Sequence, residues 1–351
     1  MKFVHETSPQ RIRFATGDAA GGVAAEIGLL GAQKVMVIAA AAERDIAESV
    51  TAGIAVVLRH DEVVMHVPVD VAVRARAAAS RADADAIVCV GGGSTTGLAK
   101  AVALTTGLPI VAVPTTYAGS EATNVWGMTE GAKKTTGTDP KVLPAAVVYD
   151  ASLMFSLPVD LSVASGLNAL AHCVDSLWAP RANPINAALA AEGARALAAG
   201  LPQIVQDPRD VEGREQALYG AYLAAVAFAS AGSGLHHKIC HVLGGKYDLP
   251  HAQTHATVLP YVLAFNAPNA HGAEERLRTA FGSSTGQAGL QALRQALDAP
   301  RALRDYGFKE GDIPAAVDDI LHVAPATNPT PVNADNLARL LKSACEGSEI
   351  E

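Results

Sequence analysis

The stretch "AIVCVGGGSTTGLAKAVAL", residues 86–104, decides the fold of the first half of the chain. An apolar run ends at Val90, and an alanine-rich helical pattern begins after Gly93, so the stretch predicts a buried strand, a tight turn and a helix. Glycines let the backbone approach an anion, and the free amides at the start of the helix favour phosphate there. We interpret the stretch as a nucleotide-binding unit, although such a glycine cluster also occurs as a simple turn.

Four further apolar runs repeat this pattern: "KVMVIA" at 34–39, "GIAVVLR" at 53–59, "LPIVAVPTT" at 108–116 and "PAAVVYD" at 144–150. Continuous β-branched runs separated by helical stretches are typical of a parallel sheet whose strands are buried on both faces. After Pro158 only long helical patterns follow, such as residues 161–179 and 186–201. The sequence therefore predicts an α/β nucleotide-binding domain over residues 1–157 and an all-helical domain over residues 158–351.

Composition agrees with two globular domains and excludes several classes of partner. Of 351 residues, 50% are hydrophobic and 18% are charged, which is enough apolar material for large cores. The net charge of -8 disfavours nucleic acid and anionic membranes, because those partners require a basic face. Four scattered cysteines and an amino terminus without an apolar signal core predict a reduced, cytoplasmic protein.

One uncharged stretch, residues 217–235, approaches the length of a membrane span. It is rich in Ala, Gly and Ser rather than Leu and Ile, and small residues let helices pack closely. We expect a central helix of the helical domain here. The Pro- and Asn-rich residues 324–333 are expected to form a loop.

Five of the eleven histidines fall within "GLHHKICHVLGGKYDLPHAQTH", residues 234–255. His237 and His241 are four residues apart, as are Asn168 and His172, so each pair projects from one face of a helix. Clustered imidazoles indicate either metal binding or acid–base catalysis. The alternative is a polar core, which is a costly way to fill buried space.

A run of hydroxyl and small side chains, "VAVPTTYAGSEAT" at 111–123, follows another predicted strand and could enclose a pyrophosphate or a nicotinamide. The predicted cofactor-binding residues of the two loops are Gly91, Gly92, Gly93, Ser94, Thr115, Thr116 and Ser120.

From "FATGDAAGG" at 14–22 to "LPYVLAFNAP" at 259–268, the motifs and their order resemble the iron-containing (group III) alcohol dehydrogenase superfamily. The resemblance implies an amino-terminal nucleotide-binding domain, a helical domain, an active site in the cleft between them and a homodimer. Within the superfamily, "VPTTYAGSEAT", "GLNALAHCVDS" and "GLHHKICHVLGGKYDLPHAQTHATVLP" resemble the maleylacetate reductases. Those enzymes use a nicotinamide cofactor to reduce 4-oxohex-2-enedioate to 3-oxoadipate during the breakdown of aromatic compounds.

The metal-dependent relatives hold their ion through an Asp, a His and two further histidines, which match Asn168, His172, His237 and His251. Asn168 stands where the carboxylate belongs. A neutral amide is a poor ligand for a hard divalent cation, although three imidazoles could still hold zinc. We therefore expect no functional metal; if one is bound, these four residues hold it.

The resemblance to an enone reductase implies roles for the other site residues. Hydride transfer to the conjugated double bond leaves an enolate, which hydrogen-bond donors stabilise. His172, His237 and His251 could supply such donors, and His241 could deliver the proton. Because the substrate is a dicarboxylate, Lys238 is the first candidate to bind it. Further substrate-binding candidates are His236, Tyr117, Asn168 and Ser120, with Lys246 and Arg181 as additional cations.

The cofactor preference depends on the residue after the second strand, where NAD-specific relatives carry an Asp. Here that place falls on Ala40, and Arg44 nearby could accept a phosphate. We expect NADH, with NADPH also possible. Relatives also carry Asp where this chain has Gly97. The alternatives are a metal-dependent alcohol or polyol dehydrogenase, a lyase resembling dehydroquinate synthase, and a nucleotide-binding protein without turnover.

Overall fold

The computed structural model describes residues 1–131 and 133–349. The chain divides into two compact units, residues 7–157 and residues 158–351 together with residues 1–6. The sequence places residues 1–6 with the first domain, but they pack with the helical unit, where His5 Nδ1 lies 3.2 Å from Ser230 Oγ.

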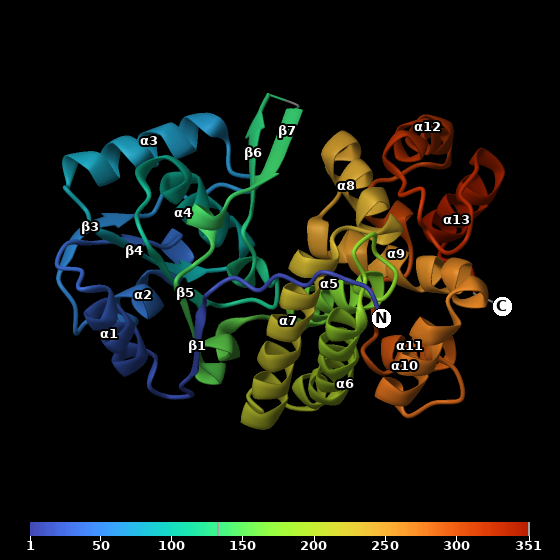
Figure 1. Ribbon diagram of the computed structural model, residues 1–351, viewed down its shortest axis with the longest axis horizontal. Coiled ribbons are helices and arrows are strands. Elements are labelled where there is room, and N and C mark those ends of the chain that lie inside the picture. The colour runs from blue at the N-terminus through green and yellow to red at the C-terminus, as the bar shows by residue number, and fades with distance from the viewer. Residues whose placement is uncertain (132, 350–351) are drawn as a thin grey trace. The chain divides into compact units, whose positions relative to one another are not determined.

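The first unit is built on a six-stranded, all-parallel sheet with the order β1-β8-β5-β4-β2-β3 (Figure 1). The strands are β1 (Arg11–Phe14), β2 (Val35–Ile38), β3 (Val56–His60), β4 (Ala86–Gly91), β5 (Ile110–Pro114) and β8 (Ala146–Tyr149). The α/β fold class is confirmed, and five of the six strands lie in the predicted apolar runs.

The strands that were predicted from the sequence are mainly those that are buried along their length. The inner strands β2, β4, β5 and β8 are buried along their whole length, as their continuous apolar runs predict. The unpredicted β1 lies at the edge of the sheet, where Arg11 and Arg13 bond the buried carboxylate of Glu26 at 2.7 and 3.0 Å. Because arginines alternate with other residues in β1, this edge strand has no continuous apolar run and was not predicted.

Four helices cover the sheet: α1 (Ala19–Leu30), α2 (Arg44–Val50), α3 (Val69–Arg81) and α4 (Gly93–Thr106). Residues of α1 and α2 share one core with Val88 of β4 and Val148 of β8. Successive residues of a strand point to opposite faces, so Ile87 and Cys89 face the other way, where α3 and α4 pack (Figure 1). Both faces of the sheet are therefore covered.

The strand order reverses at one point of this sheet. Strand β2 pairs with β3 on one side and with β4 on the other, so the chain reverses its direction of winding there. In open parallel sheets, ligands bind outside the carboxyl ends of the strands at such a switch point. The glycine loop after β4 occupies this position.

A two-stranded antiparallel sheet, β6 (Val125–Glu130) with β7 (Lys133–Thr138), was not predicted. Its strands are rich in Thr and Gly and carry no continuous apolar run. At Gly137 an added Cβ would lie 2.7 Å from the ring of Trp126, so the indole lies directly over this glycine.

The second unit is all-helical, as predicted. Its helices are α5 (Val159–Ser176), α6 (Pro184–Gln206), α7 (Val211–Ala231), α8 (Leu235–Tyr247), α9 (His251–Asn266), α10 (His271–Phe281), α11 (Gly286–Ala296), α12 (Ile313–Val323) and α13 (Ala334–Glu346). Helix α5 is central, because it packs against α6, α7 and α9. The predicted loop at 324–333 joins α12 to α13.

Short 3-10 helices complete the described chain: Ala41–Glu43, Ser120–Ala122, Pro140–Val142, Ala151–Ser156, Ala267–Asn269, Leu303–Tyr306 and Glu310–Asp312.

The uncharged stretch at 217–235 lies mostly in α7, whose Ala217, Leu218 and Ala224 are buried. Within the described residues, no single helix has the length and composition to cross a membrane. Helices α7 and α8 meet those criteria only together, and the chain bends by 98° between them.

Glycines bring the backbones of α6 and α7 into close contact. A Cβ added at Gly200 would lie 2.5 Å from the carbonyl oxygen of Gly213, and one added at Gly220 would lie 2.9 Å from that of Gly193. The expectation that small residues allow close helix packing here is therefore confirmed.

We predict that Gly200→Ala lowers the free energy of unfolding by about 1–3 kcal/mol, because the new methyl meets backbone that cannot rotate away. Chemical unfolding followed by circular dichroism measures this. Gly245→Ala in α8 is the control, because nothing lies within 4 Å of its added Cβ. Alanine there should add up to about 1 kcal/mol through helix propensity. Equal effects of the two substitutions would contradict the close contact.

Candidate functional site

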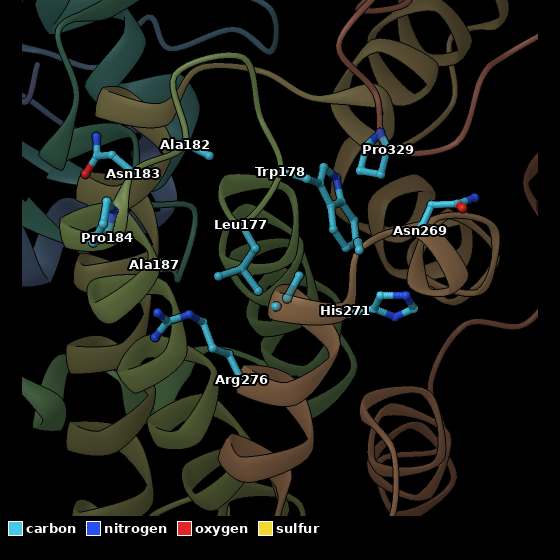
Figure 2. Close-up of a pocket in the computed structure, with 13 residues that line it drawn as sticks. Leu177, Trp178, Ala182, Asn183, Pro184, Ala187, Asn269, His271, Arg276 and Pro329 are labelled. Atoms are coloured by element: carbon cyan, nitrogen blue, oxygen red, sulfur yellow. The ribbon is translucent and has the colours of Figure 1, made fainter. Parts of the chain in front are cut away.

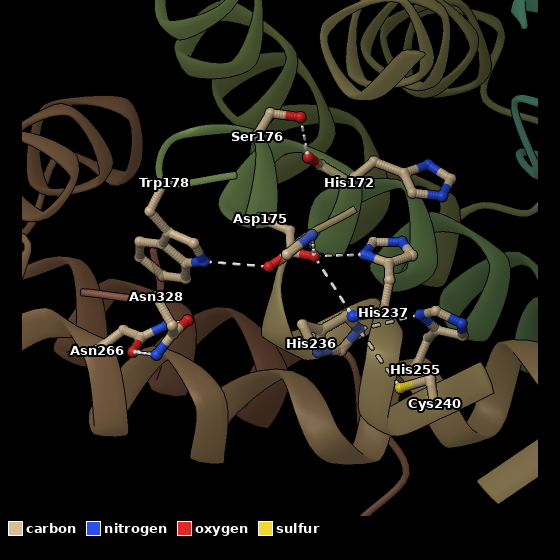
Figure 3. A network of polar contacts seen from close by, with 11 residues as sticks. His172, Asp175, Ser176, Trp178, His236, His237, Cys240, His255, Asn266 and Asn328 are labelled. Carbon is tan, nitrogen blue, oxygen red and sulfur yellow. Dashed lines mark hydrogen bonds and ion pairs between the residues drawn. The ribbon is translucent and has the colours of Figure 1, made fainter. Parts of the chain in front are cut away.

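Helices α5, α8 and α9 bring the predicted histidines together. Figure 3 shows three of them, His172, His236 and His237. Helix α8 starts after Gly234, whose extended backbone caps it, and α9 starts after Pro250. His172 and His237 stack with ring centroids 4.8 Å apart. We call the resulting group the histidine site: His172, His236, His237, His241, His251 and His255.

Asp175, which the sequence analysis did not select, organises this site (Figure 3). Its carboxylate is fully buried, and its Oδ1 accepts the indole N–H of Trp178 at 3.0 Å. Its Oδ2 accepts the backbone N–H of Gly234 at 2.8 Å, that of His237 at 3.3 Å and bonds His237 Nδ1 at 2.8 Å. The available signal was spacing, since Asp175 follows His172 by three residues on one helix face.

This bond changes the role expected of His237. A carboxylate only accepts hydrogen bonds, so Nδ1 carries the proton and Nε2 of the neutral ring carries a lone pair. His237 Nε2 is buried and has no hydrogen-bond partner within residues 1–131 and 133–349. In its neutral form His237 therefore does not donate to an enolate, whereas His172 and His251 remain candidates for that role.

His255 is an addition to the predicted site. Its Nδ1 lies 2.9 Å from Nε2 of His236, and Cys240 Sγ lies 3.6 Å from the same Nε2. All three side chains are buried. Burial raises the pKa of the Cys240 thiol well above its usual value, so without a bound metal the sulfur stays protonated within this hydrogen-bonded group.

Burial keeps the inner imidazoles neutral. It lowers the pKa of His172 to about 3, with a further contribution from His251. Burial also lowers the pKa values of His236, His237 and His255 well below the usual value, and neighbouring imidazoles add to the effect. These four rings are therefore uncharged at neutral pH.

The remaining predicted residues lie at the margin of the histidine site. His241 and His251 are exposed, and Lys238 is half-buried. No hydrogen bond or ion pair of Lys238 occurs within the described residues, so its ammonium group is available to a ligand. By contrast, Lys246 already pairs with Asp319 at 2.6 Å, and Arg181 donates to the Ser230 carbonyl at 3.0 Å.

Those two bonds make Lys246 and Arg181 poor choices for a substrate carboxylate. Tyr117, also proposed for that role, is fully buried, which argues against direct contact with substrate. The substrate-binding roles of these three residues stay predictions.

The residues present do not fit the hard divalent ion that the family name implies. Asn168 is buried and offers only a neutral Oδ1. Among the described histidines, cysteines and acidic residues, ligand atoms converge within 4.8 Å in one group, His236, Cys240 and His255. That group contains none of the three histidines that the relatives' metal site would need.

The predicted cofactor loops lie side by side at the carboxyl ends of β4 and β5. Gly91 has φ 150° and leaves space for Thr95, since an added Cβ would lie 2.4 Å from Thr95 Oγ1. At Gly92 an added Cβ would lie 2.9 Å from Thr116, and Thr115 N donates to the Gly91 carbonyl at 3.2 Å. The two loops therefore form one continuous backbone surface, with Gly93 and Ser94 opening α4.

Lys100 is a second buried polar residue that the sequence analysis did not select. It is fully buried in α4, and its Nζ donates to the Ser120 carbonyl at 2.6 Å, to Thr123 Oγ1 at 3.0 Å and to the Val125 carbonyl at 2.8 Å. Burial lowers the pKa of Lys100 to about 7, while the nearby Glu121 carboxyl raises it. Lys100 thus fixes the segment that carries Ser120. A lysine inside an otherwise uncharged helix was the available signal.

The residues that bear on cofactor preference lie near the end of β2. Ala40 follows this strand, as expected, and Arg44 pairs with Asp61 at 3.1 Å on the surface. Gly97 has a steric explanation, because an added Cβ would lie 2.9 Å from the buried side chain of Val67.

A pocket of about 450 Å³ lies elsewhere in the helical unit, lined by residues that include Trp178, Asn183, His271 and Arg276 (Figure 2). None of the predicted site residues lines it. Trp178 links it to the histidine site, because its indole N–H is donated to Asp175.

We predict that the protein loses stability as pH falls from 7.5 to 5.5. An unfolded histidine has a pKa of about 6.5, so it binds a proton when the pH falls below that value. The four buried rings do not bind this proton in the folded state. Each ring therefore contributes a slope of up to about 1.4 kcal/mol per pH unit. Burial raises the pKa of Asp175, so this one group has the opposite effect and favours the folded state as the pH falls.

Chemical unfolding across this pH range measures the slope. His172→Gln should lower the slope of the unfolding free energy against pH by up to about 1.4 kcal/mol per pH unit, the contribution of one proton. His271→Gln, at an exposed position, should leave the slope unchanged. A His172→Gln slope equal to that of the wild type would show that this ring is protonated in the folded protein.

Two family models match the chain: "Iron-containing alcohol dehydrogenase" over residues 9–151 and "Fe-containing alcohol dehydrogenase family, C-terminal" over residues 162–345. Maleylacetate reductase 1 of Cupriavidus pinatubonensis is 42% identical over 348 residues, covering 99% of this chain and 98% of its own. The crystal structure of an iron-containing alcohol dehydrogenase from Corynebacterium glutamicum has a TM-score of 0.98 at 62% identity, covering 99% and 98% of the two chains. That of maleylacetate reductase from Agrobacterium tumefaciens has a TM-score of 0.94 at 40% identity, covering 99% of each. The chain belongs to the iron-containing alcohol dehydrogenase family.

Proposed function

We propose that this protein is a maleylacetate reductase, which uses NADH or NADPH to reduce 4-oxohex-2-enedioate to 3-oxoadipate. The observation that carries the proposal is Asn168, a neutral buried amide among imidazoles where a metal-dependent alcohol dehydrogenase needs a carboxylate. Full-length likeness to relatives named maleylacetate reductase supports it. The alternative is a metal-dependent alcohol or polyol dehydrogenase, which the likeness to the Corynebacterium alcohol dehydrogenase favours.

The reaction needs one hydride and one proton. A nicotinamide cofactor held at the loops of Gly91 and Thr115 would supply the hydride for the alkene carbon β to the ketone, and the substrate would become an enolate that residues of this chain must stabilise. His172 and His251 donate hydrogen bonds to the enolate oxygen, and His241 gives a proton to the carbon α to the ketone. Solvent would then return the proton to His241.

The substrate carries two carboxylates, which an acidic protein must meet with local positive charge. Lys238 is suited to bind one of them, because it is half-buried beside the histidines and has no ion pair within the described chain. His236 is fully buried and bonded to His255, so it supports the site from within and does not contact substrate.

The cofactor binds at the loops that hold Gly91, Gly92, Thr115, Thr116 and Ser120. NADH is the preferred form, and the absence of a carboxylate at Ala40 allows NADPH as well. A homodimer in the cytoplasm completes the proposal, in keeping with the family resemblance and with four free, buried cysteines.

Purified protein should oxidise NADH rapidly with maleylacetate and should give little reduction of NAD with ethanol, glycerol or 1,2-propanediol. Absorbance of the reduced cofactor measures both directions. Robust oxidation of a simple alcohol without turnover of maleylacetate would favour the alcohol dehydrogenase alternative.

Variants separate binding from chemistry within the same assay. Lys238→Ala should raise KM for maleylacetate with little change in kcat, because it removes a contact to the dianion. Lys246→Ala is the control, since that lysine already pairs with Asp319. His241→Ala should lower kcat by about 10²–10⁴-fold through loss of a positioned acid. Unchanged kinetics in Lys238→Ala would exclude this account of carboxylate binding.

We further propose that no metal ion takes part. The purified protein should contain far less than one iron or zinc per chain by elemental analysis and should keep its activity in chelator. Asn168→Asp should raise metal affinity, because a carboxylate suits hard cations, without raising reductase activity. Stoichiometric metal, with activity lost on chelation and restored by one ion, would contradict this prediction.

A further inference from the structure

Asp175 is the most heavily bonded carboxylate of the helical unit and contacts no predicted substrate position. It is 0% exposed, and four N–H donors surround its two oxygens. Three of the four donors meet at Oδ2: two backbone amides at the start of α8 and the imidazole of His237. Such complete pairing is what a buried carboxylate requires.

The ring of His237 is held on its faces as well as at its edge. It stacks on His172 with an interplanar angle of 15° and lies 4.2 Å from the ring of Phe228, centroid to centroid. Its Nδ1 bonds Asp175, whereas its Nε2 is buried and has no hydrogen-bond partner among the described residues. A buried polar atom without a partner requires an explanation, and a bound substrate or an ordered water would supply one.

We propose that Asp175 is a positioning residue for the reductase site: by accepting the Nδ1–H of His237, it fixes the ring and makes Nε2 the one nitrogen that meets the substrate. The inference rests on the proposed function and adds a contact to it, since it places Nε2 of His237 against the substrate of the proposed reaction. Its structural basis does not, because the bond to Asp175 fixes the tautomer whatever the substrate.

The arrangement of donors allows a matched pair of variants. In Asp175→Asn the amide oxygen would take the place of Oδ2, which has three donors, and the amide NH₂ would then face the indole N–H of Trp178. Trp178→Phe removes that conflict. Asp175→Asn with Trp178→Phe therefore keeps an acceptor for His237 Nδ1, whereas Asp175→Leu with Trp178→Phe has nearly the same shape and no acceptor.

We expect the Asn double variant to keep kcat within about tenfold of the wild type. The Leu double variant should lose about 10²–10⁴-fold in kcat, because the tautomer and the orientation of the imidazole are no longer fixed. KM for NADH should stay the same in both. A purely structural role predicts equal losses in the two variants, and equal kcat values would overturn the proposal.

A measurement on the wild-type protein keeps the test independent of variant folding. In ¹⁵N-labelled protein, correlation spectra should show His237 with a protonated Nδ1 and an unprotonated Nε2, assigned by its loss in His237→Gln. A proton on Nε2 instead of Nδ1 would overturn the proposal. Failure of the wild type to reduce maleylacetate would count against the proposed function alone, because the tautomer is read without turnover.

Discussion

The bonds of Asp175 Oδ2 join α5 to the first turn of α8, and the geometry of the histidine site depends on them. The same oxygen accepts the backbone N–H groups of Gly234 and His237, which α8 itself cannot pair, and the ring N–H of His237. It thus sets where α8 begins and how the imidazole ring of His237 is oriented. Because a helix is rigid, the positions of Lys238 and His241 follow from that anchor.

Close packing of the helices behind the site holds α5 in place. A Cβ added at Gly166 of α5 would lie 2.4 Å from a methyl of Leu201 in α6, and α6 in turn meets α7 through glycine pairs. Contacts this short leave no room for α5 to shift. The buried imidazoles gain a fixed scaffold, and their uncharged state follows from the same exclusion of water.

The sequence predicted what depends on local pattern and missed what depends on tertiary partners. Continuous apolar runs revealed the inner strands, and helical spacing placed Asn168 beside His172. An isolated Asp175 or Lys100 gives no periodic signal, because the importance of each depends on donors or acceptors brought from distant segments. The edge strand β1 was missed for a related reason, since its arginines are neutralised by a carboxylate on α1.

Electrostatics of the helical unit favour an anionic ligand even though the protein is acidic. Four donors compensate the one fully buried carboxylate beside the imidazoles, and four of the imidazoles are neutral. With Asn168 in place of a carboxylate, Lys238 is the charge in the site that no described partner neutralises. A dianion can therefore bind near Lys238 without first displacing a protein carboxylate, whereas a neutral alcohol would leave that ammonium unpaired.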